Sequence, residues 1–203
     1  MKSMFLQDVL EQPKALRELL KQKGTLVRMA KTLRHDSVLF LGMGASYYAS
    51  LYATIYLRSH GIDAQCRELS EFIWYDSEKL LERYETIFLV SQSGETAELT
   101  RFLDLYAGKI NNCVLVTNNP QSSNAKVFTD SRVFPVFAGI ERAMGSSKTF
   151  LNTIVTLLIV ASAWIGEELN YERLIEYVEN ALTLKIELFT QDLLKKENSI
   201  LVA

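Results

Sequence analysis

Short apolar runs alternate with amphipathic segments along this chain of 203 residues, and that alternation limits the possible folds more than any other feature. The runs have the length of strands, and the segments between them repeat apolar residues at helical spacing. The expected strands are 37–41, 63–69, 86–90, 112–117 and 132–137. Strands that alternate with helices form a mostly parallel sheet covered on both faces, so the sequence predicts a doubly wound α/β fold.

Several helices are expected around this sheet. Pro13 suits a first helical turn, and we expect Gly24 to end that helix before a second one begins. The helix after the first strand runs to Gly61, with a predicted apolar side made of Tyr48, Leu51, Tyr52 and Ile55. Ser70 is expected to cap a short helix, and Gly108 to close the helix after the third strand.

The second half of the chain holds its longest helical patterns. The segment 149–165 is apolar but marginal in length for a membrane span, and it carries Asn152 and Thr153, so we expect a helix buried inside the protein. The segment 171–196 predicts one long helix or two, and residues 200–203 resemble the start of a further strand.

Composition excludes several classes of function. A net charge of −2, with lysine and arginine scattered along the chain, gives no basic surface for nucleic acid. The N-terminus reaches Asp8 too early to hold the apolar region of a signal peptide. Cys66 and Cys113 fall in predicted strands and form no metal-binding motif. We therefore expect a cytoplasmic protein with no membrane span, no bound metal and reduced cysteines.

Polar side chains gather at the turns after the first and third predicted strands. Gly44 and Ser46 follow the first strand, and the third is followed by Ser91, Gln92, Ser93 and Thr96. Neighbouring turns of this kind open onto the ligand crevice of a doubly wound sheet, where helix N-termini add N–H donors and a positive dipole. The simpler interpretation is that Ser93 only caps a helix and that Glu95 is a favourable first-turn charge.

A third hydroxyl-rich helix start, at 145–147, favours a phosphate site. The first two turns hold no lysine or arginine, so neutral donors would bind the anion, which suits a sugar phosphate and requires no cofactor. A dinucleotide fingerprint at 42–44 is rejected because Tyr47 occupies the place of the third glycine. The segment 145–149 also lacks the glycine spacing of a Walker loop.

Few titratable residues are candidates for catalysis. His35 and His60 lie at the ends of predicted helices, where imidazoles cap carbonyl groups. Glu95 and Glu141 are near the expected site and are candidate acids or bases, although first-turn and loop-ordering roles are commoner. The aromatic group at 72–75 favours packing over sugar stacking.

Taken together, these motifs resemble the sugar isomerase (SIS) domain family, in particular the first SIS repeat of glucosamine-6-phosphate synthase isomerase domains and their deglycase relatives. Four segments in the same order carry the resemblance: Gly44–Tyr47, Ser70–Phe72, Ser91–Thr96 and Ala138–Phe150. The resemblance implies a five-stranded parallel, flavodoxin-like sheet. It also implies that Ser146 contacts a sugar and that Ser46, Ser91, Gln92, Ser93 and Thr96 hold the phosphate and nearby hydroxyls of a phosphosugar. The chain departs from the family pattern at Ala45, where threonine is usual, and at 145–147.

The resemblance also indicates which parts of the family synthases to expect here. Lys2 follows Met1 where those synthases carry the nucleophilic cysteine of a glutaminase domain, so amidotransfer is not expected. The family's catalytic residues lie in a second SIS repeat, which we expect to be missing from this chain. The expected parts are N-terminal helices (1–34), a SIS phosphosugar-binding domain (35–166) and a C-terminal helical segment (167–203).

Three functional hypotheses follow. The first is the phosphosugar-binding domain of a sugar-phosphate isomerase or deglycase, with no identifiable catalytic residue of its own. The second is a single-SIS module that senses a sugar phosphate, and the third is a competent single-SIS homo-oligomer. In each case an apolar surface that would cover a second repeat predicts at least a homodimer. A competing hypothesis is a sheet that binds a nicotinamide or flavin cofactor, and it requires tight binding of a dinucleotide.

Overall fold

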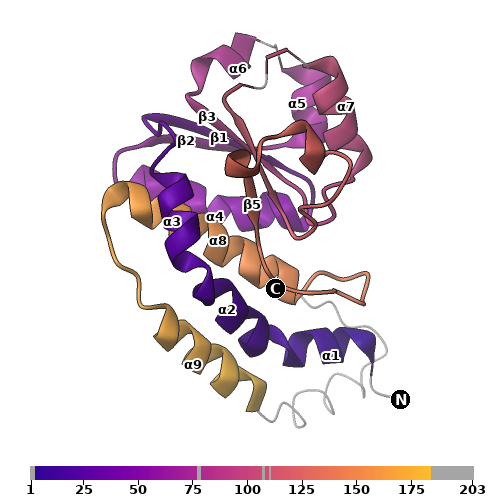
Figure 1. The fold of residues 1–203 in the computed structure, drawn as a ribbon, viewed down its shortest axis with the longest axis vertical. Coiled ribbons are helices and arrows are strands. Elements are labelled where there is room, and N and C mark those ends of the chain that lie inside the picture. Colours follow the sequence, from indigo (N-terminus) through magenta and orange to yellow (C-terminus); the bar gives the residue numbers. More distant parts are fainter. Residues whose placement is uncertain (1–2, 77–78, 107, 110, 184–203) are drawn as a thin grey trace, which may run out of the picture.

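The chain forms an α/β fold in a computed structural model that describes residues 3–76, 79–106, 108–109 and 111–183 (Figure 1). Its strands are β1 (Ser37–Gly42), β2 (Asp63–Glu68), β3 (Thr86–Val90), β4 (Cys113–Thr117) and β5 (Val133–Pro135). They pair in the order β2-β1-β3-β4-β5, and every pair is parallel. The predicted five-stranded parallel, flavodoxin-like sheet is therefore confirmed.

Helices cover both faces of this sheet. The helices of the described residues are α1 (Met4–Leu10), α2 (Gln12–Lys21), α3 (Lys23–Ala30), α4 (Ala45–Ser59), α5 (Leu69–Tyr75), α6 (Lys79–Arg83), α7 (Ala97–Leu105), α8 (Lys148–Ile165) and α9 (Tyr171–Thr183). Short 3-10 helices span Ala125–Val127 and Asp130–Arg132. Helices α5, α6 and α7 lie on one face, and α4 and α8 lie on the other (Figure 1).

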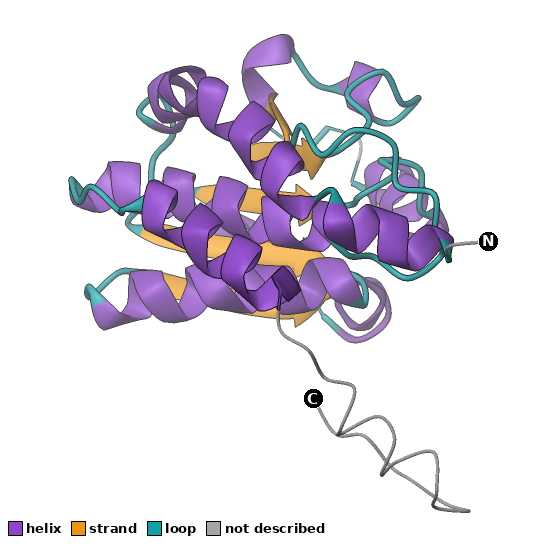
Figure 2. Ribbon diagram, turned by 90° about the horizontal axis from the view of Figure 1, so that it is seen from below, coloured by secondary structure: helices purple, strands orange, loops and turns teal. Residues whose placement is uncertain are grey.

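The strands alternate their side chains between two separate cores. Val38 and Phe40 of β1 pack in the core on the α4 and α8 side, whereas Leu39 and Leu41 pack on the α5 and α7 side. This is the period of two expected of a strand buried on both faces. All strand arrows point the same way in Figure 2, so the carboxyl ends of the strands share one edge of the sheet.

Helix α8 is the central helix of one face, as predicted from its apolar sequence. By length and composition it is the kind of helix that can cross a membrane, yet 61% of it is buried inside the molecule. Asn152 of this helix makes hydrogen bonds inside the protein: its Nδ2 donates to the carbonyl oxygens of Ala15, at 3.1 Å, and Val136, at 2.8 Å. The side chain of Asn152 thereby joins α2 to the chain just after β5.

The prediction of which side of α4 packs inward is wrong. Tyr48, Tyr52 and Ile55 are 58%, 54% and 66% exposed, whereas Ala49 and Ala53 are fully buried. The helix packs between β1, β2 and α8, where small side chains allow close approach. The large residues therefore face outward and form an exposed apolar stripe, Tyr48–Tyr52–Ile55.

Some predicted boundaries also change. Gly24 lies in the first turn of α3 and does not end α2, and Ser70 lies inside α5, whose N-cap is Glu68. Helix α7 ends at Leu105, before Gly108. The expected helix beyond 183 and the expected strand at 200–203 lie outside the described residues.

Three other expectations are confirmed. Pro135 lies in the edge strand β5. Cys66 lies in β2 and Cys113 lies in β4. At the end of α4, His60 Nδ1 lies 2.8 Å from the carbonyl oxygen of Tyr56, as a capping imidazole would.

Candidate functional site

The turn between β3 and α7 is built around Gly94. This residue has φ +68°, a conformation that glycine adopts at little cost, and a Cβ there would lie 2.3 Å from Ser122 Oγ. Ser91 Oγ accepts a hydrogen bond from the Gly94 N–H, and Ser93 Oγ accepts one from the Glu95 N–H, each at 3.1 Å. The serine hydroxyls thus shape the turn. Since α7 has Thr96 as its N-cap, Ser93 is not the helix cap that the simpler interpretation required.

The turn between β1 and α4 brings a helix N-terminus close to the sheet. A Cβ on Gly42 would lie 2.9 Å from the carbonyl carbon of Ser46, so only glycine permits this approach. Gly44 is the N-cap of α4, with φ +50°. Neither α4 nor α7 receives a side-chain cap from its N-cap residue. Both helices therefore direct first-turn N–H groups and positive dipole ends toward the carboxyl edge of the sheet.

The loop 138–147 between β5 and α8 forms the facing wall. Asn118, just after β4, holds its start: Nδ2 donates to the Gly139 carbonyl at 2.7 Å, and Oδ1 accepts from the Ala138 N–H at 2.9 Å. Glu141 holds its end, because the carboxylate accepts from the backbone N–H groups of Ser147, Lys148 and Thr149, at 2.9, 3.1 and 3.1 Å. The N-terminus of α8 is thus capped by the chain's own carboxylate.

Glu141 also fixes hydroxyl groups near the cavity. Its carboxylate accepts hydrogen bonds from Ser147 Oγ, at 2.8 Å, and from Thr149 Oγ1. Ser146 Oγ lies 2.7 Å from Thr149 Oγ1. Because the Thr149 proton is directed to the carboxylate, the Ser146 proton is directed to Thr149, and the lone pairs of Ser146 stay free to accept.

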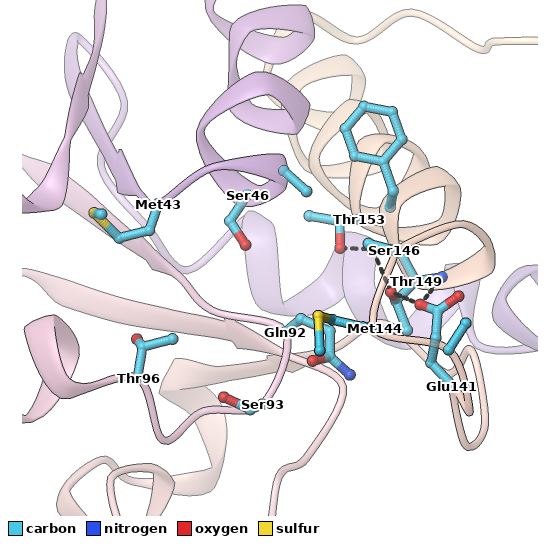
Figure 3. Close-up of a pocket in the computed structure, with 13 residues that line it drawn as sticks. Met43, Ser46, Gln92, Ser93, Thr96, Glu141, Met144, Ser146, Thr149 and Thr153 are labelled. Carbon is cyan, nitrogen blue, oxygen red and sulfur yellow. Dashed lines mark hydrogen bonds between the residues drawn. The ribbon is translucent and has the colours of Figure 1, made fainter. Parts of the chain in front are cut away.

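These three segments enclose a cavity of about 220 Å³. Figure 3 shows Ser46, Ser93 and Thr96 on one side of it and Glu141, Ser146 and Thr149 on the other. The complete lining is Met43, Ala45, Ser46, Gln92, Ser93, Thr96, Glu141, Ala143, Met144, Ser146, Thr149, Phe150 and Thr153. Among these described residues Glu141 carries the only formal charge. The electrostatic attraction for an anion therefore comes from the helix ends on the opposite side.

The structure places most of the predicted site residues on this cavity. Its lining includes Ser46, Gln92, Ser93, Thr96 and Ser146. Gly44 and Ser91 are not in the lining: Gly44 is the N-cap of α4, and Ser91 is only 3% exposed and accepts a hydrogen bond from the Gly94 N–H within the turn. The two residues position the lining and do not form part of it.

Sequence reasoning missed the wall contributed by α8. Thr149 and Thr153 line the cavity one helical turn apart, and Phe150 lies beside them. The available signal was the spacing of Thr149 and Thr153, which places these two hydroxyls on one face of the helix next to its start. Of the two candidate carboxylates, Glu141 caps α8, and Glu95 accepts a bond from the Ser123 N–H at 3.4 Å.

Comparison with known proteins agrees with this architecture. The chain is 27% identical over 162 residues to glutamine–fructose-6-phosphate aminotransferase of Pyrococcus horikoshii, and the match covers 77% of this chain and 26% of that protein. The chain thus spans about a quarter of the length of the curated relatives it matches.

Two solved structures share the fold. Glucosamine-6-phosphate deaminase from Thermotoga maritima is 24% identical with a TM-score of 0.68, over 87% of this chain and 53% of that one. Tagatose-6-phosphate ketose/aldose isomerase from Escherichia coli is 15% identical with a TM-score of 0.69, over 89% of this chain and 52% of that one.

The family model of the SIS domain matches residues 33–163, from just before β1 to near the end of α8. That range contains all five strands and every residue that lines the cavity. The chain therefore belongs to the SIS domain family.

Proposed function

We propose that this chain is the phosphosugar-binding domain of a sugar-phosphate isomerase, an amino-sugar-phosphate isomerase or a deglycase. The phosphate would lie between the start of α4 and the β3–α7 turn, against Ser46, Gln92, Ser93 and Thr96. The observation that carries this proposal is the convergence of two helix N-termini without side-chain caps on one hydroxyl-lined cavity. An oxyanion is the ligand that matches those N–H groups and hydroxyls.

The opposite wall suits the rest of a sugar. Ser146 presents lone pairs to the cavity because its proton is directed to Thr149. A hydroxyl or amino group on the ligand would be the matching donor. The curated relatives are aminotransferases of fructose 6-phosphate by name, which is consistent with a ketose or amino-sugar phosphate.

A sensor that binds without turnover is the second candidate, and one observation favours it. Among the described residues that line the cavity, Glu141 is the only carboxylate, and it is engaged by three backbone N–H groups and two hydroxyls. A carboxylate held as a helix cap is a poor general base, because removal of its charge would leave those donors unpaired. Turnover would then need a residue from another chain or another domain.

Titration calorimetry on the native chain and on Ser93→Ala tests the binding proposal. Glucosamine 6-phosphate and fructose 6-phosphate are each expected to bind saturably. Loss of one hydroxyl from a phosphate contact should weaken binding by about tenfold. The same mixtures, assayed for interconversion, separate a sensor from an enzyme.

Ser59→Ala is the matched control, since Ser59 lies at the far end of α4, where its hydroxyl donates to the Tyr56 carbonyl and lies 3.2 Å from His60 Nδ1. That variant should bind like the native chain. If Ser93→Ala binds both sugar phosphates with native affinity, the phosphate does not lie at this turn.

We also propose that the chain forms at least a homodimer through the Tyr48–Tyr52–Ile55 stripe of α4. The three side chains are more than half exposed and uncharged. A twofold contact brings a surface against its own copy, so an apolar stripe without like charges is suited to it. This stripe begins two residues after Ser46, so such a contact would lie beside the cavity.

Light scattering on the native chain and on Ile55→Asp tests the assembly. The native chain should have at least twice the mass of one chain, and a charge buried in the contact should shift the variant to monomer. Leu105→Asp is the control, because Leu105 is 53% exposed on α7, on the other face of the sheet. A native chain that is monodisperse as a monomer would refute the dimer.

A further inference from the structure

Helix α1 buries one polar residue, Asp8. Asp8 is the only buried residue of this helix, with 0% exposure, while Phe5, Leu6 and Leu10 are each more than 40% exposed. A seven-residue helix has little stability of its own. The place of α1 therefore depends on contacts with the rest of the protein, and those of Asp8 lead to the wall of the cavity.

Asp8 contacts both ends of that wall segment, at residues 142–143 and at residue 148. Oδ2 accepts from the backbone N–H groups of Arg142, at 2.7 Å, and Ala143, at 2.9 Å. Oδ1 lies 3.0 Å from Arg142 Nη1 and 3.1 Å from Lys148 Nζ. Arg142 and Lys148 bracket the segment that contains Ala143, Met144 and Ser146, which line the cavity. One carboxylate thus spans this part of the wall from behind.

Two further contacts support the same arrangement. Lys148, only 2% exposed, also pairs with Glu11 at 2.5 Å. The charges of Asp8 and Glu11 are therefore matched by those of Arg142 and Lys148 at this junction between α1, α2 and the wall. The ring of Phe5 lies against Gly145, where an added Cβ would be 3.3 Å from Phe5 Cε2. The N-terminal segment therefore contacts the wall through Phe5, Asp8 and Glu11.

We propose that Asp8 is a positioning residue, which sets the place of the wall 142–148 and thereby the affinity for the sugar part of the ligand. The inference rests on the proposed function. The phosphate would lie on the other side of the cavity, against the β3–α7 turn, away from the contacts of Asp8. Loss of Asp8 should therefore weaken sugar binding and leave phosphate binding unchanged, a division that a general loss of stability does not produce.

The test compares native chain and Asp8→Asn by calorimetry with glucosamine 6-phosphate, fructose 6-phosphate and inorganic phosphate. Asn keeps the size but not the charge, so the amides of Arg142 and Ala143 lose their ionic acceptor. We expect sugar-phosphate affinity to fall about tenfold, with phosphate affinity within about twofold of native. Hydrogen exchange at the amides of 142 and 143 should accelerate, and Asp8→Glu should recover most of the lost affinity.

Asn112→Ala is a control for stability alone. Asn112 Nδ2 donates to the carbonyls of Leu81 and Tyr84 at the opposite edge of the sheet, so this variant is destabilised without any contact with the wall. Its ratio of sugar-phosphate to phosphate affinity should stay native. If Asp8→Asn fails to fold, Glu11→Gln weakens the same junction and should shift the ratio in the same direction, by less.

The outcomes separate this inference from the proposed function. An Asp8→Asn variant that loses both affinities equally, or neither, overturns the positioning role while native binding stands. A native chain that binds neither sugar phosphate nor phosphate overturns the proposed function, and the positioning role with it.

Discussion

Substitution of Glu141 by glutamine should lower the free energy of unfolding by roughly 2–4 kcal/mol, because bonds to a charged acceptor are lost and an amide group meets backbone donors. The carboxylate accepts from the N–H groups of Ser147, Lys148 and Thr149, which begin the long central helix. Thermal unfolding should show a decrease in Tm of roughly 5–10 °C. Ligand affinity should fall as well, since Thr149 would no longer orient Ser146.

Glu168→Gln provides the control for this substitution. The Glu168 side chain is 88% exposed and pairs with Lys23 at 3.2 Å, so the change should cost less than about 0.5 kcal/mol. If the two variants unfold at the same temperature, Glu141 does not cap α8 in solution.

Gly94→Ala is expected to abolish measurable sugar-phosphate binding and to destabilise the fold by roughly 2–4 kcal/mol, the sum of a left-handed alanine and a steric clash. The new Cβ would lie 2.3 Å from Ser122 Oγ and 3.0 Å from Thr117 Oγ1. The turn must then move away from β4. That movement would carry Ser93 and the start of α7 out of line with Ser46. Denaturant unfolding and calorimetry with fructose 6-phosphate measure the two effects.

Gly166→Ala isolates the steric part of this effect. Gly166 also has positive φ, +80°, but a Cβ there would meet nothing within 4 Å. The control should lose only the roughly 1–2 kcal/mol of the left-handed conformation and should bind normally. If Gly94→Ala behaves in the same way as Gly166→Ala, the close packing of the turn against Ser122 is not what shapes the cavity.

Local patterns were sufficient to predict the sheet. Buried strands of a parallel sheet are continuous apolar runs, and β1, β3 and β4 are runs of this kind between turn residues. In a doubly wound sheet the ligand crevice lies at the carboxyl ends of the strands, so the site could be placed at the ends of β1 and β3. Ser46 and Ser93 were found in this way, from hydroxyls at strand ends.

The exposed side of α4 could not be predicted from the same reasoning. Tyr48, Tyr52 and Ile55 form a helical stripe that looks like a core face, but the inner face holds Ala49 and Ala53. Hydrophobicity marks a core side only when large residues have room there, and the room depends on how closely α8 and the sheet approach. In the folded protein the face with Ala49 and Ala53 therefore packs inward, and the apolar stripe stays exposed.

The sequence by itself determined the parallel α/β fold, the two hydroxyl-bearing turns and the family, because each depends on residues close together in the chain. Ser146 on the facing wall was expected from the family resemblance, but only the tertiary structure decided how that wall is held. Asp8 and Arg142 are 134 residues apart, and their contact depends on how the loop returns over α1. Hydrogen bonds across such distances leave no periodic pattern, since each partner is a single polar residue whose role is fixed only when the fold brings the two together.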